Sequence, residues 1–81
     1  MKVTVQFFSY YKNLAGAESA TVELTEGAKL STLVNLLMEQ YPGLAPTRER
    51  AMFMIDQRMA SRETVLSDGD QVIMLQIVGG G

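Results

Sequence analysis

Apolar and polar residues alternate at the start of the chain. Val3, Val5 and Phe7 recur at every second position within residues 2–10, and the positions between them are polar. A period of two is typical of a strand with one buried face, so these residues predict a first strand. The alternation resumes over residues 20–24, after turn-forming residues at 13–16, and the two segments together predict a β-hairpin.

The pattern changes to a helical period over residues 30–41. The apolar positions there are spaced by three or four residues, as one face of a helix requires, and they are Leu30, Leu33, Val34, Leu37 and Tyr41. We interpret these five residues as part of the core. Pro42 and Gly43 end the helix, because proline disfavours helical geometry in the preceding residue and glycine readily adopts a left-handed conformation. Residues 44–47 are then expected to form a loop.

Short strands are predicted for the second half of the chain. Residues 51–56 alternate, and the alternation places Phe53 and Ile55 on one face and Met52 and Met54 on the other. A tight turn at residues 56–58 is followed by a brief strand at residues 59–60.

The last predicted strand covers residues 71–78 and follows a turn at residues 66–70. Gly69 is expected to have a positive φ in this turn. The carboxylates of Asp68 and Asp70 flank this glycine, a pattern that we interpret as a turn rather than a cation site. The arginines of the second half are interpreted as a solvated surface rather than a site for an acidic partner; they are Arg48, Arg50, Arg58 and Arg62.

This order of elements predicts an α+β fold of the β-grasp type, in which a mixed sheet wraps one main helix. The first and last strands are expected to lie side by side and parallel in the middle of the sheet. We assign residues 1–78 to one domain and residues 79–81 to a flexible C-terminal glycine tail.

Composition narrows the chemistry that the chain can perform. The 81 residues include no cysteine and no histidine. Seven basic and nine acidic residues give a net charge of −2. Without thiolates or imidazoles, we expect no metal site, no bound cofactor and no catalysis by the chain alone. The net charge predicts that the chain does not bind nucleic acid. The absence of a long apolar run and of a signal-peptide pattern predicts that it does not associate with a membrane and that it is cytoplasmic.

Several apolar residues are predicted on the face of the sheet that points away from the helix. Phe8 interrupts the polar face of the first strand, and the last strand is apolar on both faces. Methionines add to this surface, and their flexible side chains suit contact with more than one partner, although core filling explains any single methionine equally well. We predict a partner interface formed by Phe8, Met59, Ile73, Leu75, Val78 and Gly79.

The chain resembles the small, sulfur-carrying subunits of molybdopterin synthase, which are ubiquitin-like β-grasp proteins. The resemblance covers essentially the whole chain and rests on KVTVQFFSYYKNLAG, TVELTEGAKLSTLVNLLMEQYPGL, DQRMASRETVLSDGDQVIMLQIV and the closing Gly80-Gly81. Two positions depart from the family pattern: Gln76-Ile77 replace a common pair of prolines, and Asp56 replaces an asparagine. These departures leave open the alternative that the sulfur goes to another pathway, such as thiamine thiazole synthesis.

The resemblance implies a reaction at the terminal carboxylate of Gly81, which Gly80 precedes. An E1-like adenylating enzyme would activate this carboxylate with ATP, and sulfur would replace the adenylate to give a thiocarboxylate. The large subunit of molybdopterin synthase would then use the thiocarboxylate to supply dithiolene sulfurs, within a heterotetramer. A ubiquitin-like modifier that forms isopeptide bonds, a passive adaptor, and a merely frayed glycine end are the alternatives.

The glycines themselves fit delivery of a carboxylate into another protein. A channel that admits residues without Cβ atoms can be narrow, and glycine allows main-chain angles closed to other residues. Ordering three glycines opposes docking by about 3 to 6 kcal/mol, so the folded domain must contribute an apolar docking surface.

Overall fold

The computed structural model describes residues 1–75 and contains five strands and three helical segments in that range. Their order is β1 (Lys2–Phe7), α1 (Tyr10–Ala15), β2 (Ser19–Glu23), α2 (Leu30–Gln40), the 3₁₀ helix η1 (Pro42–Thr47), β3 (Met52–Ile55), β4 (Arg58–Ala60) and β5 (Gln71–Leu75). The predicted boundary between domain and tail at residues 78 and 79 lies outside the described residues.

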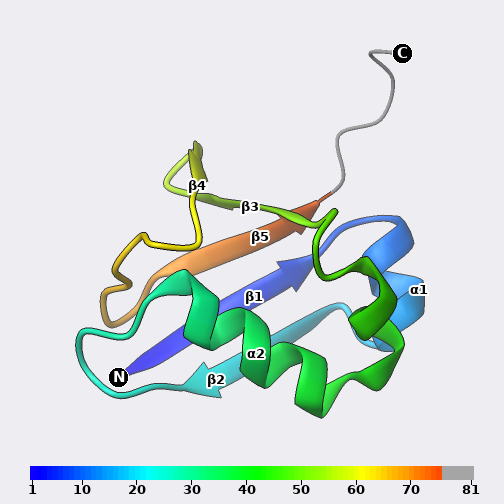
Figure 1. Cartoon of the computed structure of the whole chain (residues 1–81), viewed down its shortest axis with the longest axis horizontal. Coiled ribbons are helices and arrows are strands. Elements are labelled where there is room, and N and C mark those ends of the chain that lie inside the picture. The colour runs from blue at the N-terminus through cyan, green and yellow to red at the C-terminus, as the bar shows by residue number, and fades with distance from the viewer. Residues whose placement is uncertain (76–81) are drawn as a thin grey trace.

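The strands form one mixed sheet in the order β2-β1-β5-β3-β4. The central strands β1 and β5 are parallel, as predicted, and the other neighbouring pairs are antiparallel. Helix α2 lies across one face of this sheet (Figure 1). The predicted α+β architecture, a sheet that wraps one main helix, is confirmed.

The core lies between α2 and the inner face of the sheet. Cross-strand pairing aligns Val5 with Val72 and Phe7 with Met74, and all four side chains are buried. The helix contributes its predicted apolar stripe, of which Leu30, Leu33, Val34 and Leu37 are buried and Tyr41 is half-buried against the core. Phe53 is also buried, whereas Ile55, which we placed on the same face, is only half-buried.

Helix α1 corrects the prediction of a simple hairpin between the first two strands. The first strand ends at Phe7 rather than residue 10, and the N–H of Tyr11 donates to the carbonyl of Phe8 across a tight turn. Residues 10–15 then form a short helix of six residues that ends at Gly16, whose φ is 72°. The burial of Tyr11 supplies the packing that a helix this short needs.

The segment after α2 also differs from the predicted loop. Residues 42–47 form the 3₁₀ helix η1, and Gly43 does not have a positive φ there. Glycine is required at this position for a steric reason: a Cβ atom would meet the carbonyl oxygen of Leu14 in α1, well inside van der Waals distance. Gly43 therefore permits η1 and α1 to approach closely.

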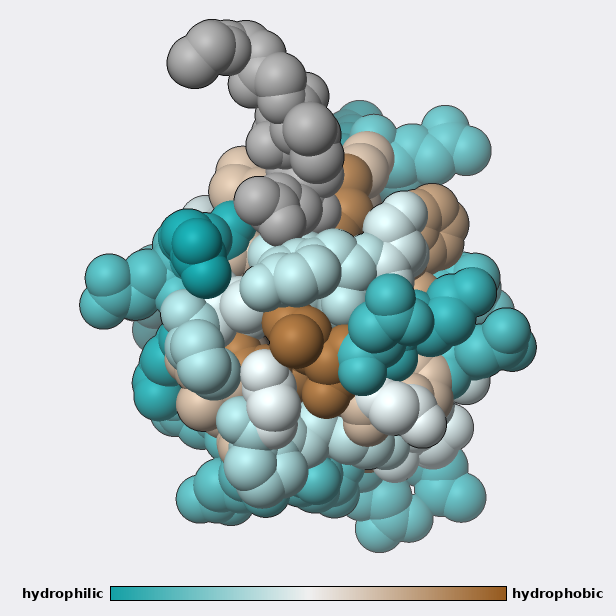
Figure 2. All heavy atoms as spheres, turned by 90° about the vertical axis from the view of Figure 1, so that its right-hand side faces the viewer, coloured by the Kyte–Doolittle hydropathy of each residue, from teal (hydrophilic) through white to brown (hydrophobic). Residues whose placement is uncertain are grey.

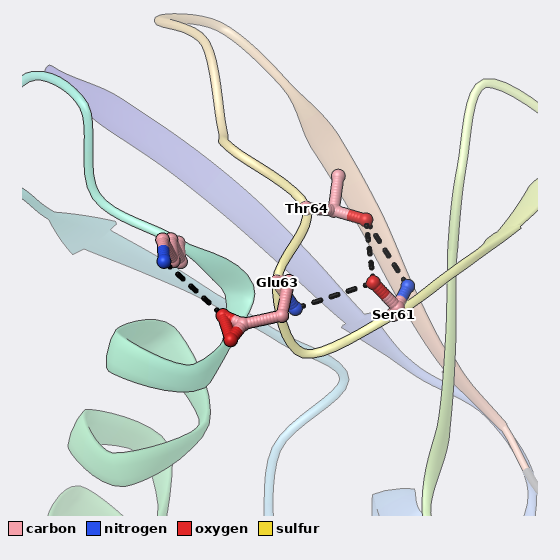
Figure 3. A network of polar contacts seen from close by, with 4 residues as sticks. Ser61, Glu63 and Thr64 are labelled. Atoms are coloured by element: carbon pink, nitrogen blue, oxygen red, sulfur yellow. Dashed lines mark hydrogen bonds and ion pairs between the residues drawn. The ribbon is translucent and has the colours of Figure 1, made fainter.

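The loop between β4 and β5 caps the first turn of α2. The N–H groups of Leu30 and Ser31 donate to the carbonyls of Thr64 and Arg62, at 2.8 and 3.0 Å, and so satisfy two donors that the helix leaves free. Contacts within the loop hold its shape (Figure 3): the N–H of Ser61 donates to Oγ1 of Thr64, and the N–H of Glu63 donates to Oγ of Ser61.

The two turns of the second half match their prediction. Gly69 has a φ of 86°, and the carboxylates of Asp68 and Asp70 accept main-chain N–H groups of Lys2 and Ser67 at 2.7 and 2.8 Å. These carboxylates therefore stabilise a turn. The tight turn between β3 and β4 places two non-glycine residues, Asp56 and Gln57, at φ values of 52° and 65°.

Candidate docking surface on the outer face of the sheet

The sheet face opposite α2 carries a group of apolar side chains that its register brings together. Met54 is paired with Ile73 on one side and with Met59 on the other, and Met52 is paired with Leu75. Residues that face each other across a pair of strands point to the same side of a sheet. The side chains of β3, β4 and β5 therefore form one continuous apolar surface.

Phe8 extends this surface from the neighbouring strand. Its N–H donates to the carbonyl of Met74 at 3.2 Å, which continues the parallel pairing of β1 and β5 by one residue and aligns Phe8 with Leu75. We define the outer apolar face as Phe8, Met52, Met54, Met59, Ile73 and Leu75.

The members of the outer apolar face are open to solvent to different degrees. Phe8 and Met59 are 45% and 46% exposed, and Met52 is 37% exposed. Met54, Ile73 and Leu75 are half-buried among them. An antiparallel or mixed sheet with one face in solvent usually places polar residues on that face, so this concentration of apolar residues indicates a contact surface.

The position of Leu75 connects this face to the end of the chain. Leu75 is the last described residue of β5, and it lies between Met52 on β3 and Phe8 after β1. The part of the chain that the structure describes therefore ends on the outer apolar face. Four residues of the predicted site, Val78, Gly79, Gly80 and Gly81, lie outside the described residues.

A shallow hollow of about 280 Å³ adjoins the face beside Phe8. It is lined by Gln6, Phe7, Phe8, Ser9, Lys12 and Glu18. The ammonium of Lys12 and the carboxylate of Glu18 are 3.8 Å apart at its rim. At the end of the molecule nearest α1, apolar groups lie between hydrophilic ones (Figure 2).

The sequence predicts four members of the outer apolar face and leaves the position of two others open. Phe8, Met59, Ile73 and Leu75 were predicted, and the structure brings them together. For Met52 and Met54 the sequence pattern allows both core and outer face, and only the register with β5 assigns them to the outer face. Tyr10, which is 46% exposed, was not predicted as a surface aromatic residue because α1 was not predicted.

One arginine has a structural role that the sequence interpretation missed. The guanidinium of Arg62 donates to the carbonyls of Arg48 and Ala51 at 2.9 and 3.2 Å, and it lies 5.0 Å from the centroid of the Phe53 ring. Arg62 therefore fastens the segment between η1 and β3, in addition to any interaction with solvent. Arg48 donates a hydrogen bond to Asn35 of α2.

The described residues contain no group suited to metal binding or to crossing a membrane. Within residues 1–75, no three His, Cys, Asp or Glu side chains cluster so that they could hold a metal ion. In the same range, no helix is both long and apolar enough to span a bilayer. What the outer apolar face offers is hydrophobic contact.

Comparisons with known proteins agree with this architecture. The chain is 32% identical to the molybdopterin synthase sulfur carrier subunit of Mycobacterium tuberculosis, over 100% of this chain and 99% of that protein. It is 26% identical to the protein of the same name from Chlamydomonas reinhardtii, with both chains covered completely.

Solved structures show the same fold. SAMP1 from Haloferax volcanii superimposes with a TM-score of 0.87 at 17% identity, over the whole of both chains. A complex of subunits 1 and 2 of the molybdopterin-converting factor from Helicobacter pylori contains a chain that matches with a TM-score of 0.72 at 23% identity, again over the whole of both chains. The model of the ThiS family matches residues 5–81. The chain therefore belongs to the ThiS family.

Proposed function

We propose that the chain is the sulfur carrier subunit of a molybdopterin synthase. The observation that carries the proposal is the position of Leu75, the last described residue of the central strand β5, between Met52 and Phe8. The full-length similarity to relatives named as sulfur carrier subunits supports it. The proposed reactive group is the carboxylate of Gly81, six residues beyond Leu75.

The proposed mechanism uses the backbone of the chain as the carrier. An E1-like enzyme adenylates the carboxylate of Gly81 with ATP, and sulfur replaces the adenylate to form a thiocarboxylate. The thiocarboxylate then enters the active site of the large subunit and gives its sulfur to the dithiolene of molybdopterin. Gly79 and Gly80 allow this entry because a narrow channel excludes residues with side chains.

The outer apolar face offsets the cost of ordering the glycines. That cost is about 3 to 6 kcal/mol for three residues. Removing about 200 Å² of apolar surface from water contributes roughly 5 kcal/mol at about 25 cal/mol per Å². Burial of this size offsets the ordering cost of the glycines, and the loss of free rotation and translation on association requires further contact area.

The partners follow from this mechanism. The complex of subunits 1 and 2 of the Helicobacter pylori factor supports the large subunit as the docking partner. The adenylating enzyme is the second partner, and both would use the outer apolar face in turn. The expected assembly with the large subunit is a heterotetramer in the cytoplasm.

An intact-mass experiment tests the reaction. The full chain is incubated with the adenylating enzyme, ATP and a sulfur donor, and the expected product has gained the mass of one oxygen-to-sulfur exchange. A chain that lacks Gly80 and Gly81 is the control, and it should fold normally but show no exchange. An unchanged mass for the full chain, with the enzyme shown to be active, would contradict the proposal.

A ubiquitin-like modifier is the second candidate. The observation in its favour is the fold, which matches that of SAMP1 from Haloferax volcanii with a TM-score of 0.87. A second structure of this protein carries the name small archaeal modifier protein 1. A modifier would appear as lysine adducts of slower electrophoretic mobility, without sulfur exchange. The same incubation, repeated with cell extract, therefore separates the two functions.

The docking role of the outer apolar face makes a separate prediction. Leu75→Glu places a charge on the outer apolar face between Met52 and Phe8, and we expect the affinity for the large subunit to fall by about 2 kcal/mol or more, as for a hot-spot contact of an interface. Gln71→Glu is the matched control, because it adds the same charge to an exposed position at the other end of β5.

Isothermal titration calorimetry with the large subunit measures both variants, and scanning calorimetry confirms that they remain folded. Equal affinities for Leu75→Glu and the unmodified chain would remove the outer apolar face from the interface. Unfolding of Leu75→Glu would mean that Leu75 stabilises the core instead.

A further inference from the structure

The methionines of this chain divide into two groups by position. Met38 and Met74 are buried, at 8% and 0% exposure, and Met1 is half-buried against the core. The other three, Met52, Met54 and Met59, all lie on the outer apolar face. Because the chain has no cysteine, thioethers are its only side-chain sulfur.

The three surface methionines are neighbours. Met54 and Met59 are directly paired between β3 and β4, and Met52 lies two residues before Met54 on the same face of β3. Met52 and Met54 are in turn paired with Leu75 and Ile73. A change in the polarity of these sulfurs would therefore alter the middle of the outer apolar face.

Peroxides oxidise thioethers that solvent can reach, and they convert a flexible apolar side chain into a polar one. The exposures of Met59 and Met52, 46% and 37%, meet that condition, and Met54 is half-buried between them. Strands usually favour β-branched and aromatic residues, so three methionines side by side on a solvent-facing sheet are not explained by strand propensity.

We propose that Met52, Met54 and Met59 form a peroxide-sensitive modification site that lowers the affinity of the outer apolar face for its partners. In each reaction, the thioether sulfur attacks one oxygen of hydrogen peroxide and the O–O bond breaks. One oxygen becomes the S=O oxygen, and the other leaves as water with both hydrogens. The sulfur is oxidised by two electrons and the peroxide is reduced.

The effect on docking follows from desolvation, and this part rests on the proposed function. A sulfoxide is a strong hydrogen-bond acceptor, and burying it against an apolar partner removes its water without a replacement. The domain itself stays folded, because Met74 and Met38 in the core are protected by burial. Methionine sulfoxide reductases reverse the reaction, so the site can regain its affinity.

The first experiment needs no partner. The purified full chain is treated with limiting hydrogen peroxide, the reagent is removed, and peptide mapping by mass spectrometry follows each methionine over time. We expect Met59 and Met52 to react about tenfold or more faster than Met74, with unchanged circular dichroism and earlier elution from a hydrophobic-interaction column. Comparable rates for Met74 and Met59, loss of the fold, or unchanged elution would overturn the proposal.

Two variants assign the effect to these residues. The combined variant Met52→Leu, Met54→Leu and Met59→Leu keeps the face apolar and of similar volume, and its elution should not respond to peroxide. Met38→Leu removes a methionine from the helix instead and should respond as the unmodified chain does.

The second experiment measures the dissociation constant with the large subunit of molybdopterin synthase. Oxidation of the carrier should raise Kd by about tenfold or more, equivalent to about 1.4 kcal/mol, and the combined leucine variant should show no rise. An unchanged Kd after oxidation overturns the regulatory role. If the unoxidised chain does not bind at all, the proposed function fails, and the mapping and elution experiment still decides whether the modification site exists.

Discussion

At the scale of single residues, Tyr11 combines deep burial with an unpaired polar group. Its side chain is 1% exposed, and its hydroxyl has no hydrogen-bond partner among the described residues. Burial raises the pKa of Tyr11 above its ordinary value of 10.0, the nearby guanidinium of Arg50 opposes this rise, and Tyr10 adds to it. The folded domain therefore holds the phenolic proton more tightly than the unfolded chain does.

This shift predicts a loss of stability at alkaline pH. The contribution of Tyr11 to stability is fully present below its unfolded pKa of 10.0, and it is lost as pH rises towards the higher pKa of the folded state, because the unfolded chain then releases the proton first. We expect Tyr11→Phe to remove this part of the alkaline loss and to be neutral or stabilising by up to about 1 kcal/mol at pH 7. Urea unfolding between pH 7 and 11 measures both effects.

Tyr10→Phe is the matched control for this prediction. Tyr10 lies next to Tyr11 in α1 but is half exposed, so its hydroxyl keeps its water in the folded state. A Tyr11→Phe variant that is destabilised by more than the control at pH 7 would show that the hydroxyl of Tyr11 is hydrogen-bonded after all.

Gly43 is exposed to solvent and yet should not tolerate alanine. A methyl group at this position would overlap the main chain of Leu14, and two backbone segments cannot move apart without separating η1 from α1. We expect Gly43→Ala to destabilise the domain by about 1 to 3 kcal/mol in urea unfolding. Ala45→Gly, in the same 3₁₀ helix and also exposed, should cost about 1 kcal/mol or less. Equal stability of Gly43→Ala and the unmodified chain would contradict the close approach.

At the scale of elements, the turn between β3 and β4 has the geometry of a hairpin but not the preferred residues. Both Asp56 and Gln57 have positive φ, the conformation for which Asn-Gly is the favoured pair. Gln57→Gly should therefore stabilise the domain by about 1 kcal/mol, because glycine avoids the cost of the left-handed conformation. Thermal unfolding measures the gain.

Gly69→Ala provides the opposite test of the same physical effect. Gly69 has a φ of 86° and open space around its Cα, so alanine there changes conformational strain without a clash. It should lower the unfolding temperature, whereas Gln57→Gly should raise it. A decrease for both variants would mean that strain at positive φ does not limit stability in these turns.

The elements that the sequence predicts well are those with a clear period and a sharp end. Helix α2 extends over three turns with four of the predicted apolar residues, Leu30, Leu33, Val34 and Leu37, and its C-terminal bound differs from the prediction by one residue. Helix α1 is too short to establish a period, and its only buried residue is Tyr11. The turn residues 13–16 therefore predict a hairpin, because local composition does not show the tertiary contact of α1 with η1.

At the scale of the whole molecule, the outer apolar face could be predicted only in part. The alternation in β5 was enough to place Ile73 and Leu75 opposite Val72 and Met74. The same reasoning does not show on which face Met52 and Met54 lie, since in a strand of four apolar residues the alternation does not identify the buried face. The pairing of β3 with β5 decides the matter, and such pairing depends on residues about twenty positions apart.

The parallel pairing of β1 with β5 has a mechanical consequence. Force applied to Lys2 and Leu75 loads the hydrogen bonds between these central strands in shear, so that they resist together. Force applied to Met52 and Ser61 instead opens the β3–β4 hairpin from its free end, one pair after another. Because the chain has no cysteine, two introduced thiols give unique handles for each geometry, and we expect shear to need the higher rupture force in single-molecule pulling. A pull on the C-terminal end of β5 would therefore meet the resistance of this shear geometry.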